Sequence, residues 1–195
     1  MNNRAIPVFF NTDNNYAVPT YITLFSLLYN YRGLPDIHAY ILTAEDFSNK
    51  NKILLNTLSD QFKQVKIKIV KVENNYDNVP IQLNHLSKAA LFRLMIPRIA
   101  DYLTDGQMET CIYLDSDLVV EGNISELFNI DINGYFVGGI KDMAQIFEKD
   151  TDFKDKLGIP SLDCYINSGV LLYNIKEINS RNGLRERLEQ DGYKR

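Results

Sequence analysis

Hydrophobic and polar positions along the chain switch between two periods, and this switching predicts strands and helices in turn. Apolar runs typical of strands occupy residues 5–10, 37–42 and 65–72, and the last run, VKIKIVKV, alternates strictly as a half-buried strand does. Between these runs, residues 17–31 and 44–62 carry apolar side chains at helical spacing. Strands and helices that alternate in this way indicate βαβ units and a mainly parallel sheet.

The second half of the chain continues the pattern. The segment LSKAALFRLMIPRIADYL predicts a helix that begins near Ser87 and is broken or kinked around Pro97. A polar region at 141–156 and the charged tail at 181–195 also have helical patterns. Three further strands are predicted, at residues 111–115, 135–140 and 168–175.

The length and continuity of the chain indicate one domain. Its 195 residues are enough for a sizeable hydrophobic core, and no repeat, low-complexity tract or linker divides them. We therefore expect a single α/β domain over residues 1–195, with a Rossmann-like mixed sheet, mainly parallel, flanked by helices.

The composition narrows the class of protein. Hydrophobic residues make up 45% and charged residues 24% of the chain, as in ordinary soluble domains. The formal net charge of −4 argues against a nucleic-acid-binding protein, although a bound cation can still create a site for an anion. No apolar run is long enough for a secretion signal or a membrane span. Cys111 and Cys164 lack metal-binding spacing, so we expect buried thiols in a cytoplasmic protein.

Two aspartates interrupt the apolar stretch CIYLDSDLVVEG at the end of the fourth predicted strand. Asp115 and Asp117 are two positions apart, so their side chains point the same way, roughly 6.5–7 Å apart along an extended chain. A backbone turn at Ser116 would let both carboxylates bind one divalent cation, with positions left for phosphate oxygens and water. The alternative is a solvated turn, because D-x-D alone is a weak motif.

Other polar side chains also fall at the ends of predicted strands. Asp13 and Asn15 follow the first strand, Asp142 follows the strand at 135–140, and Asn167 with Ser168 precedes the last strand. Ligands of open α/β sheets bind beyond the carboxyl ends of the strands, so this convergence favours a binding site. Each cluster has a plainer alternative, which is a polar turn or a helix cap.

Arg93 stands among apolar neighbours in AALFRLMI. One alternative is an arginine that pairs with a structural acid or lies in a solvated stripe. The other is an arginine whose planar fork reaches a phosphate or sugar.

Several enzyme classes lack their motifs here. The chain has no Walker-type phosphate loop, and no G-x-G-x-x-G follows the first strand. A nucleotidyltransferase would need a glycine-rich, basic loop where the sequence has NTDNN. A metal-dependent phosphatase would need the acid pair on the first strand, with further acids and a lysine downstream.

Four segments, in chain order, resemble glycosyltransferase family 8, the retaining transferases that include bacterial lipopolysaccharide galactosyl- and glucosyltransferases and glycogenin. FFNTDNNYAVPTYITLFSLLYN is similar to the family's opening strand, nucleotide-binding turn and first helix. LNHLSKAALFRLMIPRI resembles the segment whose arginine faces the donor, and CIYLDSDLVVEGNISELF resembles the metal-binding D-x-D segment. YINSGVLLYNIKEI resembles the asparagine-bearing strand.

The resemblance implies a GT-A-type fold and transfer of glucose or galactose from a UDP-hexose to a saccharide or glycolipid, with retention of configuration. It implies Mn²⁺ (or Mg²⁺) bound by Asp115 and Asp117, uracil and ribose contacts from Asp13 and Asn15, and His85 on the acceptor side. It names no catalytic nucleophile. The residues implied to contact the nucleotide sugar are Thr12, Asp13, Asn15, Arg93, Asp115, Ser116, Asp117, Asp142, Asn167 and Ser168.

The C-terminal pattern of the family is missing from these 195 residues. The resemblance implies a later Q-D-x-x-L-type segment, a metal-binding histidine and a lysine near the diphosphate, and both histidines here precede the D-x-D. We therefore expect a domain without its C-terminal part, and two alternatives stay open: an active transferase, or an inactive UDP-sugar-binding remnant or fragment. Contact with the inner membrane face and pairing with a second copy are further expectations.

Overall fold

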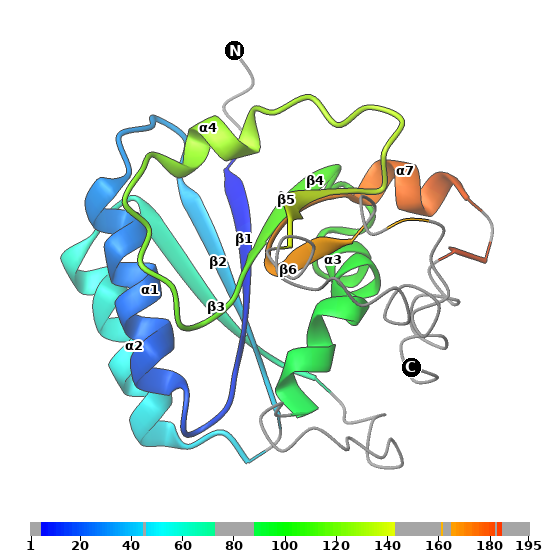
Figure 1. The fold of residues 1–195 in the computed structure, drawn as a ribbon. Helices are drawn as coiled ribbons and strands as arrows, with labels where there is room; N and C mark the ends of the chain where they lie inside the picture. The colour runs from blue at the N-terminus through cyan, green and yellow to red at the C-terminus, as the bar shows by residue number, and fades with distance from the viewer. Residues whose placement is uncertain are drawn as a thin grey trace.

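The structure is a computed structural model, and it describes residues 5–44, 46–72, 88–142, 161, 165–181 and 183–184. The described residues form a six-stranded sheet in the order β3-β2-β1-β4-β6-β5, with helices on both faces (Figure 1). The strands are β1 (Ile6–Thr12), β2 (Ile37–Thr43), β3 (Val65–Lys71), β4 (Thr110–Leu114), β5 (Val137–Lys141) and β6 (Ile166–Asn174).

Strand direction places several strand ends at one edge of the sheet. Strands β1, β2, β3 and β4 are parallel to one another, whereas β6 runs antiparallel to both β4 and β5. The carboxyl ends of β1, β4 and β5 and the beginning of β6 therefore lie at the same edge, which we call the site edge. The predicted mixed, mainly parallel sheet is confirmed.

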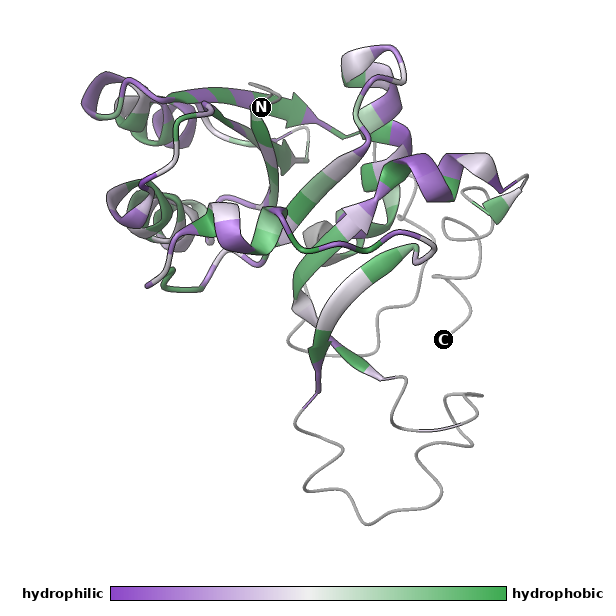
Figure 2. Ribbon diagram, turned by 90° about the horizontal axis from the view of Figure 1, so that it is seen from above, coloured by the Kyte–Doolittle hydropathy of each residue, from purple (hydrophilic) through white to green (hydrophobic). Residues whose placement is uncertain are grey.

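Helices cover the two faces of the sheet and enclose two hydrophobic clusters. On one face, α1 and α2 pack with Val8, Phe10 and Leu114; on the other, the 3₁₀ helix η1 and α3 pack with Phe9 and Tyr113. Figure 2 shows hydrophobic colouring along the strands and hydrophilic colouring mainly on the surrounding helices and connections. The helices are α1 (Ala17–Asn30), α2 (Asn49–Gln61), η1 (Lys88–Met95), α3 (Ile96–Thr104), α4 (Ile124–Phe128) and α7 (Ile175–Ser180).

A side-chain cap and a proline explain where two helices begin. Helix α2 begins at Asn49, later than predicted, because the Ser48 side chain accepts a hydrogen bond from the Asn51 amide (3.3 Å). The predicted break at Pro97 takes the form of a change from 3₁₀ to α geometry at Ile96. Proline is tolerated there because the first turn of a helix leaves its N–H groups without helical partners.

Some predicted features lie outside the described residues. They include the helical pattern at 141–156 beyond Asp142, the tail beyond Leu184, and Cys164. Cys111 is a buried thiol as expected, and burial raises its pKa. Among the helices that the structure describes, none is both long and apolar enough to cross a bilayer.

Candidate functional site

The Asp115 carboxylate lies at the site edge because of the alternation along β4. Cys111 and Tyr113 point to the face covered by η1 and α3, and Asp115 continues this row just beyond the strand. The Asp115 amide donates to the carbonyl of Gly169 (2.8 Å), so pairing with β6 extends past the end of β4. Asp115 is thus fixed beside the beginning of β6.

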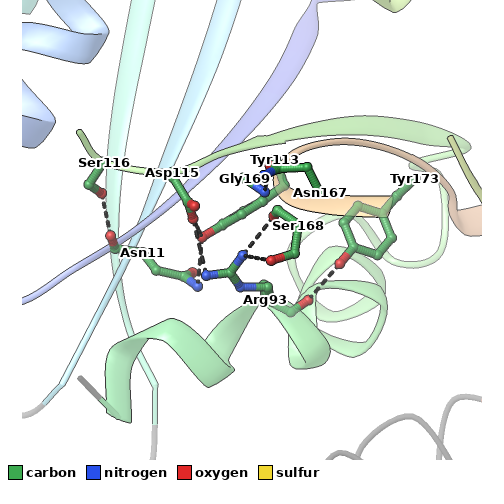
Figure 3. A network of polar contacts seen from close by, with 9 residues as sticks. All are labelled: Asn11, Arg93, Tyr113, Asp115, Ser116, Asn167, Ser168, Gly169 and Tyr173. Carbon is green, nitrogen blue, oxygen red and sulfur yellow. Dashed lines mark hydrogen bonds and ion pairs between the residues drawn. The ribbon is translucent and has the colours of Figure 1, made fainter. Parts of the chain in front are cut away.

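Arg93 links Asp115 to β6 (Figure 3). Its Nη2 lies 3.1 Å from Asp115 Oδ1, and its Nη1 donates to the carbonyl oxygen (2.6 Å) and the hydroxyl (2.9 Å) of Ser168. The Arg93 side chain is only 14% exposed and that of Asp115 is 31% exposed, so the ion pair is partly shielded from water. Charge-assisted hydrogen bonds of this kind are stronger than neutral ones. Of the two alternatives for Arg93, the structure shows pairing with an acid, Asp115, whereas contact with a phosphate or sugar stays a prediction.

Tyr113 lies beneath this ion pair, and sequence reasoning missed its role. Its hydroxyl donates to Asp115 Oδ1 (2.5 Å) and accepts from Asn11 Nδ2 (3.4 Å), and the Arg93 guanidinium carbon lies 4.8 Å from its ring centroid. Burial, supported by the nearby Asp115 charge, raises the pKa of Tyr113 far above its usual value, although Arg93 opposes this. The phenol therefore stays protonated and donates. The sequence offers one indication of this role: Tyr113 lies two residues before Asp115, so both side chains point to the same face of the strand.

The beginning of β6 contributes Asn167 and brings in Asp142. Asn167 Oδ1 accepts from the Gly169 amide (2.8 Å), and Asn167 Nδ2 donates to Asp142 Oδ2 (3.2 Å). Any side chain at 169 would displace its neighbours, because a Cβ there would lie 2.8 Å from Asp115 Oδ2 and 3.1 Å from Asn167 Oδ1. The structure thus gathers Asp115, Asp142, Asn167 and Ser168 at one edge, as their positions at strand ends predicted, and Arg93 joins them from η1.

The middle residue of the D-x-D sequence is directed inward. Ser116 is buried, and its hydroxyl donates to the carbonyl of Asn11 on β1. Its own carbonyl accepts from Thr23 Oγ1 (3.0 Å). Asp117, which follows, is exposed. The turn at Ser116 therefore anchors one aspartate beside Arg93 and presents the other to solvent.

Helix α1 holds the loop that follows Asp117 through three polar residues on one of its faces. Thr23 Oγ1 donates to the Leu118 carbonyl (2.8 Å) and accepts from its amide (3.0 Å). Ser26 Oγ accepts from the Val120 amide (2.9 Å), and Asn30 Nδ2 donates to the Val120 carbonyl (2.7 Å). Sequence reasoning did not identify these three anchors, because the helical pattern marks only the apolar part of a buried face.

The turn after β1 is closed by the Asp13 side chain, which bonds amides just before α1 and does not cap the helix. Asp13 Oδ1 accepts from the amides of Asn15 (2.8 Å) and Tyr16 (3.0 Å) at the start of α1. The Thr12 hydroxyl is buried and accepts from Thr20 Oγ1 (2.7 Å). Within the described residues, no side-chain hydrogen bond or ion pair joins Asp13 or Asn15 to the Arg93–Asp115 cluster. His85 lies outside the described residues.

The oxygen atoms at the site edge are of the chemical type that hard divalent cations bind. Asp115 and Asp117 offer carboxylate oxygens, which Mg²⁺ and Mn²⁺ prefer. Asp115 Oδ1 already faces Arg93 and Tyr113, while Oδ2 lies beside the Cα of Gly169. In the part of the chain that the structure describes, no group of three His, Cys, Asp or Glu side chains is placed to hold a metal. These two carboxylates would need further ligands from substrate and water.

Curated proteins similar to this chain include glycosyltransferases. It is 26% identical over 179 residues to a putative glycosyltransferase of Haemophilus influenzae, covering 92% of this chain and 51% of that protein. It is 26% identical over 174 residues to the lipopolysaccharide 1,2-glucosyltransferase of Escherichia coli, covering 89% of this chain and 48% of that protein. The chain thus spans about half the length of these curated relatives.

Solved structures share the fold. The galactosyltransferase LgtC, in complex with donor and acceptor sugar analogues, superposes with a TM-score of 0.77 at 22% identity, over 97% of this chain and 65% of LgtC. The bifunctional glycosyltransferase WbbM has the same TM-score and identity, over 95% of this chain and 34% of WbbM. The expected GT-A-type fold is therefore confirmed. Residues 7–190 match the sequence pattern of glycosyl transferase family 8, and the chain belongs to that family.

Proposed function

We propose that this chain forms the donor-binding part of a retaining hexosyltransferase, which moves glucose or galactose from a UDP-hexose to a saccharide or glycolipid. Family membership and the E. coli relative named as a glucosyltransferase support hexosyl transfer. The observation that carries the proposal is the cluster of Arg93, Asp115 and Ser168 at the site edge. In open α/β sheets, ligands bind beyond this edge.

The nucleotide part of the donor binds over the turn after β1. Asn15 is exposed there, and its amide group suits a ribose hydroxyl. Asp13 is assigned to the uracil, with the carboxylate that also bonds the Asn15 amide accepting the imide N–H. Thr12 and Ser116 support this turn from beneath, since their hydroxyls are directed into the protein.

Asp115 and Asp117 hold Mn²⁺ or Mg²⁺ beside the diphosphate. When bound, such an ion neutralises the charge that develops on the leaving diphosphate. Asp115 is the oriented ligand, because Arg93 and Tyr113 both contact its Oδ1. Asp117 is the exposed ligand, on a loop that Thr23 fastens to α1.

The sugar lies toward β6, where the side chains offer hydrogen-bond groups of both kinds. Arg93 and Asn167 carry donors, and Asp142 and Ser168 carry acceptors, as recognition of sugar hydroxyls requires. His85 is assigned to the acceptor side on the family resemblance alone. We place the reaction in the cytoplasm, with a glycolipid acceptor bringing the protein to the inner membrane face.

A second candidate function is UDP-sugar binding without transfer. Arg93 already balances the charge of Asp115, and the described residues supply two metal ligands rather than three. A chain of this kind would bind the donor and release it unchanged.

Donor turnover tests the proposal and separates the two candidates. The protein is incubated with UDP-glucose or UDP-galactose and Mn²⁺, and release of UDP is measured with and without EDTA. Metal-dependent UDP release above the rate without protein is the expected result, because transferases also pass the sugar slowly to water. UDP binding without any release would support the second candidate and contradict transfer by this chain.

A further inference from the structure

We propose that Tyr113 is a positioning residue of the donor site, which sets the direction of the Asp115 carboxylate and supports Arg93. The inference rests on the proposed function, because it assigns Tyr113 a part in binding the metal and the diphosphate. The inference is drawn from three contacts of one buried side chain.

Two donors converge on the same oxygen of Asp115. The Tyr113 hydroxyl lies 2.5 Å and Arg93 Nη2 lies 3.1 Å from Oδ1. A carboxylate with one oxygen held from two directions cannot turn freely about its terminal bond. The other oxygen, Oδ2, is therefore held toward Gly169, where a Cβ would lie only 2.8 Å from it. Tyr113 thus selects which oxygen Asp115 presents at the site edge.

The ring of Tyr113 also supports the second donor. The guanidinium of Arg93 lies over this ring, with its central carbon 4.8 Å from the centroid (Figure 3). A cation over an aromatic face is attracted by the electron density of the ring. Tyr113 is only 1% exposed, so the surrounding side chains hold its ring in place beneath Arg93 and Asp115.

A plain packing role is the competing explanation, and the hydroxyl separates the two. The ring belongs to the hydrophobic cluster that includes Phe9, Tyr40 and Tyr173. Tyr113→Phe keeps this packing and the surface under Arg93 but removes the donor to Asp115. Tyr40→Phe is the matched control, because Tyr40 is a buried tyrosine of the same cluster that stacks on Phe9 (4.8 Å between centroids).

The experiment measures UDP binding by calorimetry over a series of Mn²⁺ concentrations, together with the melting temperature of each variant. We expect Tyr113→Phe to weaken UDP binding about tenfold at low Mn²⁺, as for loss of a hydrogen bond to a charged group. High Mn²⁺ should largely restore binding, because the ion itself then orders the carboxylate. Tyr40→Phe should bind as the wild type does.

A double-mutant cycle adds a readout that packing would not affect. In an Asp115→Asn background, Tyr113→Phe should cause no further loss of UDP affinity, because the group it positions is gone. Wild-type affinity in Tyr113→Phe, an additive loss in the cycle, or unfolding of Tyr113→Phe while Tyr40→Phe stays folded would each overturn the inference. Absence of metal-dependent UDP binding in the wild type would instead refute the proposed function.

Discussion

At the scale of single residues, the central feature of the site is the Asp115 carboxylate, which forms an ion pair with Arg93 within the protein itself. Arg93 pairs with Asp115 and also with Ser168, so one guanidinium joins η1 to the ends of β4 and β6. The planar fork of arginine makes this possible, since its N–H groups point in fixed directions. The same side chain therefore contributes both to stability and to the proposed donor site.

Replacement of Arg93 tests this double role. Arg93→Ala should lower the free energy of unfolding by about 1–3 kcal/mol, between the values for exposed and buried pairs, because Asp115 keeps its charge and loses its cation. It should also weaken UDP-hexose binding more than UDP binding, since Arg93 is assigned to the sugar. Urea unfolding and calorimetry measure the two effects.

Two further variants serve as controls for Arg93→Ala, one at the same position and one on the following helix, α3. Arg93→Lys keeps the charge but not the fork, and it should recover part of the stability and little of the sugar affinity. Arg98→Ala, an exposed position on α3, should leave donor binding unchanged. Equal loss of UDP and UDP-hexose affinity in Arg93→Ala would argue against a sugar contact.

At the scale of elements, the site depends on how α1 holds the loop after β4. Thr23 is fully buried, and its hydroxyl bonds both the amide and the carbonyl of Leu118 as well as the Ser116 carbonyl. One helical turn later, Ser26 accepts a hydrogen bond from the Val120 amide, and two turns later Asn30 donates one to the Val120 carbonyl. The helix thus determines the path of the chain that carries Asp117.

Thr23→Val tests this anchoring with little change in side-chain volume. Because the buried Ser116 carbonyl and the partly buried backbone groups of Leu118 lose their partner, the free energy of unfolding should fall by about 1–3 kcal/mol. Amide hydrogen exchange at Leu118 should accelerate, and metal-dependent UDP binding should weaken.

Thr57→Val is the matched control, because the Thr57 hydroxyl bonds only the Leu54 carbonyl within α2 (2.6 Å). Thr57 is half-buried, and the loss of this one hydrogen bond should lower the free energy of unfolding by about 0.5–1 kcal/mol. Similar losses in both variants would mean that the loop does not depend on Thr23.

Sequence patterns predicted the parts of this fold that depend on periodicity. The strict alternation of residues 65–72 identified β3, and the acid pair at the end of an apolar strand identified the site edge. The partners of Asp115 could not be predicted in the same way. Tyr113 counts as an apolar strand residue in such patterns, and its contact with Arg93 depends on how η1 crosses the sheet. Asp13 shows the opposite case, because the polar turn that was its local alternative is present in the structure, although Asp13 does not cap α1.

At the scale of the whole molecule, the sheet order makes one edge available for a ligand. Parallel β1 and β4 end there, and antiparallel β6 begins there, so side chains that are far apart in sequence meet. Arg93, Asp115 and Ser168 are brought together by this topology rather than by any local motif. We propose that this edge binds a divalent cation and the diphosphate of a nucleotide sugar, and the rest of the proposed function depends on that binding.

Calorimetric titration of UDP in the presence of Mn²⁺ tests that claim most directly. The wild-type chain should bind UDP with Mn²⁺ and lose this binding in EDTA, and the double variant Asp115→Asn with Asp117→Asn should bind at least about tenfold more weakly with its circular dichroism unchanged. Asp60→Asn, at an exposed position on α2, is the control and should bind normally. Metal-dependent UDP binding that is equal in the double variant and the wild type would contradict the account.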